Sequence, residues 1–181
     1  MNPEIQQRAA RVRLLLMDVD GVLTDGLIYN VPSPAEPHIA ETKGFNSQDG
    51  IALQWLTWCG IHTGIISGRV SKAAEVRAEQ VGMTYVYQGH IEKLPILQDI
   101  IARSNLAADA IAYMGDDLTD VPVMRSVGLA LATANARPEV KRVAHYVTLV
   151  SGGAGAVREV AELLLEAHGR WADILRKYGV E

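Results

Sequence analysis

The sequence has little cysteine and no excess of basic residues, and both shortages narrow the functions that it can have. Cys59 is the single cysteine among 181 residues, so an internal disulfide is excluded and a reducing compartment is favoured. Lysine and arginine number 17 against 21 aspartate and glutamate residues, which gives a net charge of −4. Because nucleic-acid-binding proteins usually carry a basic patch, we expect no nucleic-acid partner.

Long apolar runs are also missing from the sequence. The longest of them are far too short to cross a bilayer, so we expect no membrane insertion. Residues 1–11 carry charge and lack the apolar core of a secretory signal, which favours a cytoplasmic protein. The sequence contains no internal repeat, and 49% of its residues are apolar. We therefore expect one globular domain over residues 1–181.

Short apolar runs alternate with amphipathic stretches along most of the chain. The runs predict strands at residues 12–17, 61–66, 84–87, 110–114, 127–131 and 145–150. The amphipathic stretches predict helices at residues 2–10, 48–59, 71–81, 91–104, 120–126, 137–143 and 154–168. An alternating order of strands and helices is typical of a mostly parallel sheet with helices on both faces. The predicted fold class is therefore α/β.

Two segments interrupt this alternation. Residues 27–45 contain two short strand-like runs, at 27–31 and 39–43, joined by a proline-rich loop, which predicts a β-hairpin inserted after the first strand. The tail at residues 169–181 is predicted to form one more amphipathic helix. Covering a partner subunit or an active site would explain both segments.

Polar residues, interspersed with glycines, follow each of the first four predicted strands. In an open α/β sheet, ligands bind beyond the carboxyl ends of the strands, so we expect these side chains to share one pocket. Taken singly, most have an ordinary explanation as turn residues, helix caps or solvated charges. The four groups are Asp18, Asp20, Gly21 and Thr24; Ser67, Gly68 and Arg69; Gln88, Gly89 and Lys93; and Gly115, Asp116, Asp117 and Asp120.

The acidic pair after the first strand is the exception, because two carboxylates beside a buried strand repel each other without a counter-charge. Together, Asp18, Asp20 and Asp116 offer the hard oxygen ligands that Mg²⁺ prefers. A phosphate would then meet the Ser67 hydroxyl, the Gly68 N–H at a helix start, and the Lys93 charge. One carboxylate could attack phosphorus, and a second, two residues on, could act as acid and base.

Four stretches, DVDGVLTDG, ISGR, the lysine of HIEKLP and GDDLTD, resemble the four motifs of the haloacid dehalogenase superfamily of phosphohydrolases. Within that superfamily the sequence is similar to the 3-deoxy-D-manno-octulosonate 8-phosphate phosphatase family. The similarity includes the stretches FNSQDGIAL, VYQG, GDDLTDVPVM and GGAGAVREVAELLL. The resemblance implies a Rossmann-like core without a separate cap domain, and a homotetramer assembled through the hairpin.

The resemblance also implies roles for single residues. Asp18 would be the nucleophile and Asp20 the general acid and base. Mg²⁺ would be held by the Asp18 carboxylate, the Asp20 backbone carbonyl and Asp116. The remaining residues would be Ser67, Gly68 and Lys93 on the phosphoryl group, Arg69 and Arg77 near the substrate, and Asp117 and Asp120 in support.

The implied activity is Mg²⁺-dependent hydrolysis of 3-deoxy-D-manno-octulosonate 8-phosphate through an aspartyl-phosphate, in lipopolysaccharide biosynthesis. Two alternatives remain open. The substrate could be a related nine-carbon sugar acid 9-phosphate of the sialic-acid type. Alternatively, the chain could be a non-catalytic module, either a receiver-like phospho-acceptor or an oligomerisation domain. The long PSPAEP loop of the hairpin and the extended tail depart from the family pattern.

Overall fold

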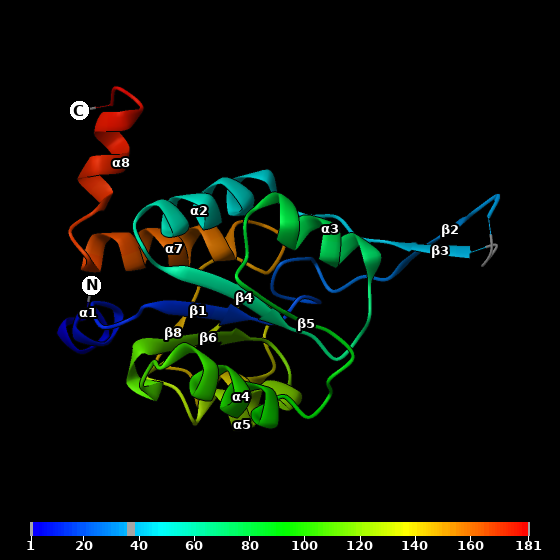
Figure 1. Ribbon diagram of the computed structural model, residues 1–181, viewed down its shortest axis with the longest axis horizontal. Helices are drawn as coiled ribbons and strands as arrows, with labels where there is room; N and C mark the ends of the chain where they lie inside the picture. Colours follow the sequence, from blue (N-terminus) through cyan, green and yellow to red (C-terminus); the bar gives the residue numbers. More distant parts are fainter. Residues whose placement is uncertain (1, 36–38, 181) are drawn as a thin grey trace.

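The centre of the molecule is a six-stranded parallel sheet with helices on both faces (Figure 1). The computed structural model describes residues 2–35 and 39–180. In spatial order the strands are β5 (Tyr85–Tyr87), β4 (His62–Ile66), β1 (Leu14–Met17), β6 (Ile111–Gly115), β7 (Leu129–Ala132) and β8 (Tyr146–Val147). The predicted α/β fold class is confirmed.

The middle strand, β1, explains why the sequence shows apolar runs rather than alternation. It pairs with β4 on one side and β6 on the other, and all four of its side chains are buried. Leu15 and Met17 point into the core on one face, and Leu14 and Leu16 into the core on the other. A strand covered on both faces needs apolar residues at every position. Each such side chain contributes roughly 1.5–3 kcal/mol on burial.

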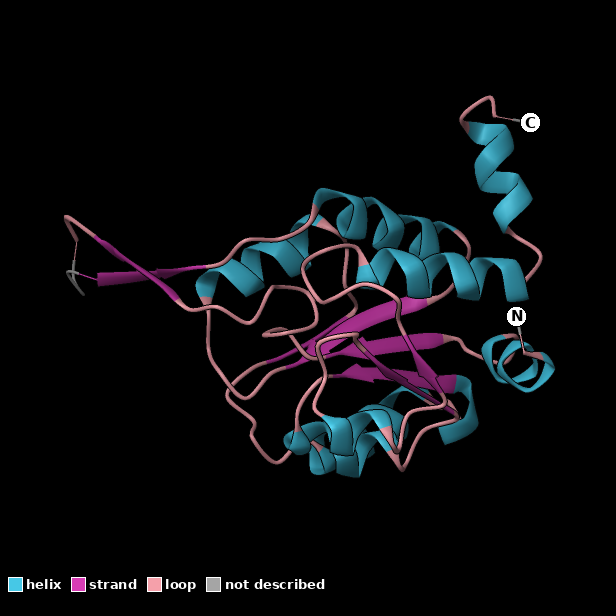
Figure 2. Cartoon of the chain, turned by 180° about the vertical axis from the view of Figure 1, so that it is seen from behind, coloured by secondary structure: helices cyan, strands magenta, loops and turns pink. Residues whose placement is uncertain are grey.

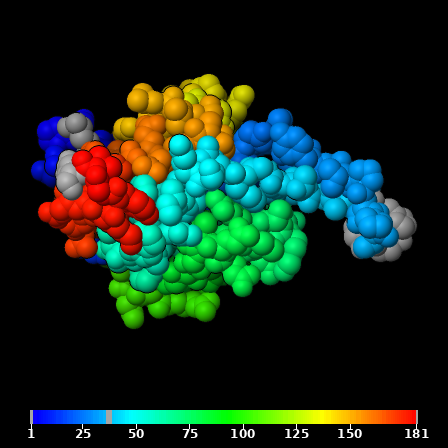
Figure 3. Space-filling model, turned by 90° about the horizontal axis from the view of Figure 1, so that it is seen from above, coloured from blue at the N-terminus to red at the C-terminus, as the bar shows by residue number. Residues whose placement is uncertain are grey.

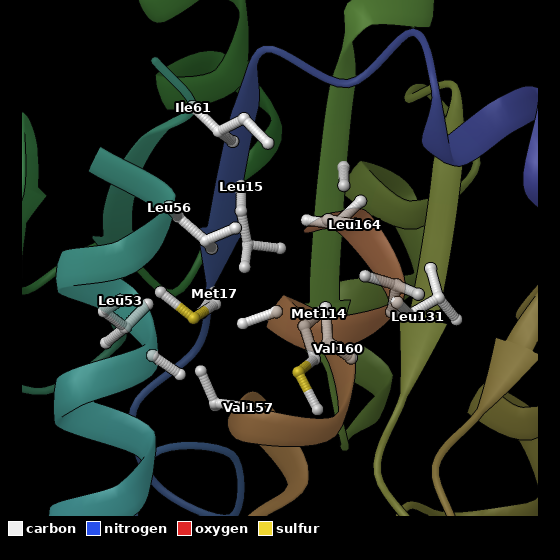
Figure 4. Close-up of a cluster of buried hydrophobic side chains, with 14 of the residues drawn as sticks. Leu15, Met17, Leu53, Leu56, Ile61, Met114, Leu131, Val157, Val160 and Leu164 are labelled. Atoms are coloured by element: carbon white, nitrogen blue, oxygen red, sulfur yellow. The ribbon is translucent and has the colours of Figure 1, made fainter. Parts of the chain in front are cut away.

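Two layers of helices cover the sheet (Figure 2). One layer comprises α1 (Pro3–Ala9), α2 (Ser47–Trp58), α3 (Lys72–Gln80) and α7 (Ala156–Ala167). The other comprises α4 (Leu94–Ser104), α5 (Val121–Met124) and α6 (Pro138–Lys141), with the short turns η1 (Ala108–Ala110) and η2 (Leu118–Asp120). Figure 4 shows Leu53 and Leu56 of α2 and Val157 and Val160 of α7 gathered around Met17 in one apolar cluster. Among the described residues, no helix has the length and apolar character that crossing a membrane requires.

The predicted hairpin is present and projects from the body (Figures 1 and 3). Its strands, β2 (Tyr29–Pro32) and β3 (Ile39–Thr42), pair antiparallel as a separate two-stranded sheet. Residues 36–38, which include part of PSPAEP, lie outside the described residues. Because the hairpin comes soon after β1 in the sequence, its base lies next to the residues that follow that strand.

The tail forms the predicted helix, α8 (Trp171–Lys177), and packs against its own chain. The ring of Trp55 on α2 lies 5.8 Å from that of Trp171 and 5.7 Å from that of Tyr178. The Trp55 indole N–H donates a hydrogen bond of 3.1 Å to the Tyr178 hydroxyl. The Arg158 guanidinium stacks 4.1 Å from the centre of a Trp55 ring. The described part of the tail thus contacts α2 and α7 of its own chain.

Several predicted elements are shorter than expected, and two of them have clear local reasons. The helix predicted at 91–104 begins at Leu94, because Pro95 has no N–H to bond back to residue 91. The strand predicted at 145–150 ends at Val147. Beyond it, the Leu149 N–H donates to the Glu159 carboxylate at 3.0 Å instead of to a neighbouring strand.

Candidate active site

The strand order places β5, β4, β1 and β6 side by side, so the residues that follow them meet at one edge of the sheet. A cavity of about 370 Å³ opens there. It is lined by Asp18, Asp20, Gly26, Ser67, Gly68, Arg69, Ile91, Lys93, Asp116, Asp117 and Thr119. The structure therefore brings together members of all four predicted groups, while Gly26, Ile91 and Thr119 were not predicted. The predicted residues that do not line the cavity are Gly21, Thr24, Gln88, Gly89, Gly115 and Asp120.

Lys93 is the buried cation at the floor of this cavity. Its side chain is only 2% exposed, and Nζ lies 3.0 Å from Asp18 Oδ1 and 2.7 Å from Asp120 Oδ1. The residue sits at the N-cap position of α4, directly before the first helical residue. A buried ammonium is tolerated only when anionic partners surround it, and here two carboxylates do so.

Asp120 holds the loop that carries Asp116. Its carboxylate is fully buried, and Oδ1 accepts hydrogen bonds from Lys93 and, at 2.7 Å, from the Tyr113 hydroxyl. Oδ2 accepts the backbone N–H groups of Asp116 at 3.0 Å and Asp117 at 3.1 Å. Both oxygens are therefore already engaged by this chain. The geometry favours the supporting role that was predicted for Asp120.

Three carboxylates, Asp18, Asp116 and Asp120, bring one oxygen each within 4.8 Å of one another. Because the Asp120 oxygens already have partners, Asp18 and Asp116 are the pair with capacity for a metal ion. Asp116 Oδ1 is buried and accepts no hydrogen bond from any described residue. A hard divalent cation such as Mg²⁺ fits this donor set. The Asp20 backbone carbonyl remains a predicted third ligand.

Gly21 lets the two acidic loops approach each other closely. Its φ angle is +89°, and a methyl group on its Cα would lie 2.1 Å from Asp116 Oδ2. Gly115 is similarly confined, since a methyl group there would lie 2.5 Å from Asp120 Cβ. Only glycine leaves room for the carboxylates at these two positions.

Burial and mutual repulsion make these carboxylates hard to ionise without a cation. Burial, followed by the negative charges of Asp18 and Asp120, raises the pKa of Asp116 to about 8. Burial also raises the pKa of Asp18 to about 6, although the Lys93 charge opposes the shift. A bound divalent cation would remove this penalty by pairing with both groups.

The raised pKa of Asp116 predicts a pH dependence for the metal-free protein. The folded state keeps a proton up to about pH 8, whereas the ordinary value for aspartate is 3.8. The stability that depends on this proton is fully present below pH 3.8, the ordinary pKa of aspartate. It decreases as the pH rises above that value and is lost as the pH passes through about 8. We therefore expect the free energy of unfolding in EDTA to fall between pH 6 and pH 8, which denaturant titrations at several pH values measure.

Two comparisons make this prediction specific. Saturating Mg²⁺ should remove most of the fall, because the cation takes the place of the proton on Asp116. An Asp116→Asn variant should show a flatter pH profile in EDTA, since the amide does not titrate. Equal slopes for the variant and the unmodified protein would contradict the assignment.

Ser67 also lines the cavity and is fixed by the loops around it. It is 3% exposed, and its Oγ accepts the Arg69 N–H at 3.2 Å. The Ser67 carbonyl accepts the His90 N–H at 2.9 Å. The prediction that Gly68 lies at a helix start is wrong, because α3 begins at Lys72 after an N-cap at residue 71. Gly68 lines the cavity from the bend before that helix.

The two arginines predicted near the substrate lie in different places. Arg69 lines the cavity. Arg77 does not: its guanidinium donates to the Asn46 carbonyl at 3.2 Å and lies 5.9 Å from the centre of the Phe45 ring. It lines a second cavity of about 530 Å³ beside the base of the hairpin. A substrate role for Arg77 stays a prediction and would need a neighbouring subunit.

A sequence profile of haloacid dehalogenase-like hydrolases matches residues 46–159. The chain belongs to this family. The resemblance to 3-deoxy-D-manno-octulosonate 8-phosphate phosphatases is also confirmed. The chain is 45% identical over 167 residues to that phosphatase from Yersinia pestis, covering 92% of this chain and 87% of the relative. With the Escherichia coli K12 phosphatase it shares 43% identity over 170 residues, covering 94% and 88%.

Solved structures of haloacid dehalogenase-like phosphatases share the whole fold. The phosphatase from Moraxella catarrhalis, crystallised with magnesium, phosphate and a KDO molecule, superposes with a TM-score of 0.92 at 36% identity. The match covers 98% of this chain and 99% of that one. The Yersinia pestis phosphatase gives a TM-score of 0.88 at 44% identity, covering 94% and 89%.

Proposed function

We propose that this protein is a Mg²⁺-dependent phosphatase that hydrolyses 3-deoxy-D-manno-octulosonate 8-phosphate to the free sugar acid and phosphate. The observation that carries the proposal is the convergence of Asp18, Lys93 and Asp116 at one cavity. The chain also covers nearly the full length of relatives named for this activity. We infer that the reaction takes place in the cytoplasm and supplies lipopolysaccharide synthesis.

The reaction would pass through two displacements at phosphorus. In the first, an Asp18 oxygen bonds to phosphorus while the ester P–O bond breaks, and Asp20 donates a proton to the departing sugar oxygen. In the second, Asp20 removes a proton from water, which attacks phosphorus and releases the Asp18 carboxylate. Ser67 and Lys93 hold the phosphoryl oxygens in both steps. A Mg²⁺ ion on Asp18 and Asp116 would neutralise the phosphoryl charge.

Substrate choice would depend on groups at the rim of the cavity. The Arg69 side chain is 51% exposed and lines the cavity, so the N–H groups that Glu41 does not hold can donate hydrogen bonds to the carboxylate of a sugar acid. The same contact would serve an eight-carbon or a nine-carbon acid. Side-by-side kcat/KM values for the two phosphates separate these substrates, and we expect the eight-carbon phosphate to be preferred.

The test of the proposed function is phosphate release from a panel of sugar phosphates with Mg²⁺ and with EDTA. We expect the highest kcat/KM for 3-deoxy-D-manno-octulosonate 8-phosphate, and loss of turnover in EDTA. A stable phosphorylated protein without turnover would instead support a receiver-like module. Absence of phosphate release from every ester would contradict the proposal outright.

We further propose that the hairpin assembles a homotetramer. Five of its apolar side chains are exposed in the single chain, namely Leu27, Ile28, Tyr29, Val31 and Ile39. Exposed apolar side chains gathered on a projecting element are typical of an interface.

A charge in the hairpin should disrupt this assembly. Ile39 is 61% exposed, and we expect Ile39→Asp to convert tetramers to smaller species, as measured by size-exclusion chromatography with light scattering. The control is Leu149→Asp, which changes an 87% exposed residue outside the hairpin and should leave the assembly intact. A tetrameric Ile39 variant, or a monomeric unmodified protein, would contradict the proposal.

A further inference from the structure

A second buried lysine, Lys43, approaches the active site from the hairpin. It follows β3 directly, and its side chain is only 1% exposed. Its Nζ lies 2.5 Å from Asp20 Oδ1 and 3.0 Å from Glu41 Oε1. Lys43 does not line the active-site cavity, and the reaction described above does not use it.

Lys43 belongs to a closed ring of four alternating charges. Glu41 binds Lys43 through one carboxylate oxygen and the Arg69 guanidinium through the other. Arg69 Nε in turn lies 3.7 Å from Asp20 Oδ2. Each oxygen of the Asp20 carboxylate therefore faces a different cation. Because an unpaired buried ammonium is strongly disfavoured, the closest pair, Lys43 and Asp20, has little freedom to separate.

The two buried lysines serve different carboxylates. Lys93 pairs with Asp18 and Asp120, whereas Lys43 pairs with Asp20 and Glu41. The Asp20 carboxylate thus has a cation of its own, on the side of the hairpin. The attraction of Lys43 offsets the electrostatic cost of holding the Asp20 carboxylate near the other acids. It also opposes the attraction of a bound cation for Asp20.

We propose that Lys43 is a positioning residue that holds the Asp20 carboxylate where it protonates the departing oxygen of the substrate. This inference rests on the proposed function, since it assigns Asp20 as the acid of the first displacement. Lys43 itself touches neither substrate nor the reacting atoms. Through it, the base of the hairpin is joined physically to the acid of the reaction.

The dependence of the rate on the leaving group separates positioning from a structural role. An alkoxide leaving a sugar phosphate needs a proton, whereas the p-nitrophenolate leaving p-nitrophenyl phosphate is stable without one. The value of kcat/KM covers binding and the first displacement only. A displaced Asp20 should therefore lower kcat/KM for the sugar phosphate far more than for p-nitrophenyl phosphate.

The experiment measures kcat/KM with Mg²⁺ for the Lys43→Met variant on three substrates: 3-deoxy-D-manno-octulosonate 8-phosphate, a simple alkyl phosphate without a carboxylate, and p-nitrophenyl phosphate. We expect a fall of about 10- to 100-fold for both alkyl esters and of no more than about threefold for p-nitrophenyl phosphate. A fall confined to the sugar acid would point to loss of carboxylate binding by Arg69 instead, and would contradict the proposal. The matched control is Lys72→Met, because that lysine is 78% exposed and pairs with Glu75 on the surface of α3. It should leave kcat/KM unchanged for every substrate.

Equal falls for the alkyl esters and p-nitrophenyl phosphate, or no fall for any substrate, would overturn the proposal. A Glu41→Gln variant gives a second test that keeps Lys43 in place. It weakens the ring, and we expect a smaller loss with the same preference for the alkyl substrate. If the unmodified protein cleaves other alkyl phosphates but not the eight-carbon one, the proposed function fails. The role of Lys43 is then tested by comparing kcat/KM for the alkyl phosphate that is cleaved with kcat/KM for p-nitrophenyl phosphate.

Discussion

Replacing Asp18 with asparagine is expected to lower kcat for phosphate release by at least about 10⁴-fold, because the amide cannot attack phosphorus. The substitution keeps the shape of the side chain. Burial already disfavours the charged form of Asp18, as its raised pKa shows, so a neutral amide there costs little stability. Lys93 still has a charged partner in the variant, because Asp120 remains. The free energy of unfolding in EDTA should therefore change little. Phosphate assays and denaturant titrations on one preparation measure both quantities.

The matched control for this variant is Asp25→Asn in the same loop. Asp25 is exposed, accepts hydrogen bonds from the Leu27 N–H at 3.0 Å and the Tyr29 hydroxyl at 2.9 Å, and does not line the cavity. Its replacement should leave kcat within about twofold, as expected for a surface residue. If Asp18→Asn retains most of the activity, Asp18 is not the nucleophile.

Among the substitutions considered, replacing Lys93 with methionine is expected to lower the free energy of unfolding the most. The change leaves the fully buried Asp120 carboxylate without its cation and leaves Asp18 beside it. Removing one partner of a buried ion pair typically costs about 3–5 kcal/mol, because the other charge stays buried and unpaired. Denaturant titration in EDTA measures the loss of stability. Phosphate release should fall as well, since Lys93 is proposed to bind the phosphoryl group.

The exposed Lys72 again provides the control. Its ion pair with Glu75, three residues on, measures 3.0 Å, but the Lys72 and Glu75 side chains are 78% and 54% exposed. Surface pairs of this kind contribute at most about 1 kcal/mol, so Lys72→Met should change the free energy of unfolding by less than that. If Lys93→Met is no more destabilising than Lys72→Met, the buried network does not support the fold.

The core of the fold could be predicted because its signals are local. The run at Leu14–Met17 is apolar at every position, as a strand covered on both faces requires. The residues just beyond four neighbouring parallel strands then had to meet, because parallel strands end at the same edge. Asp18, Ser67, Lys93 and Asp116 lie together for this reason.

Contacts that depend on the path of a loop could not be predicted. The meeting of Lys43 with Asp20 depends on how the hairpin returns to the body, and no periodicity encodes that path. Arg77 lies one turn or more into α3, and its side chain turns toward the Asn46 carbonyl rather than the cavity. The amphipathic helix of the tail could be predicted from the sequence, but its packing partner Trp55 could not.

The most direct test of the account is to stop the first turnover with acid and find the phosphoryl group by mass spectrometry. The protein would be mixed with Mg²⁺ and 3-deoxy-D-manno-octulosonate 8-phosphate for less than one turnover. We predict a phosphoryl group on Asp18 that requires Mg²⁺ and disappears as phosphate is released. Release of phosphate with the phosphoryl group found on another side chain, or with no phosphorylated protein at any time, would contradict the account.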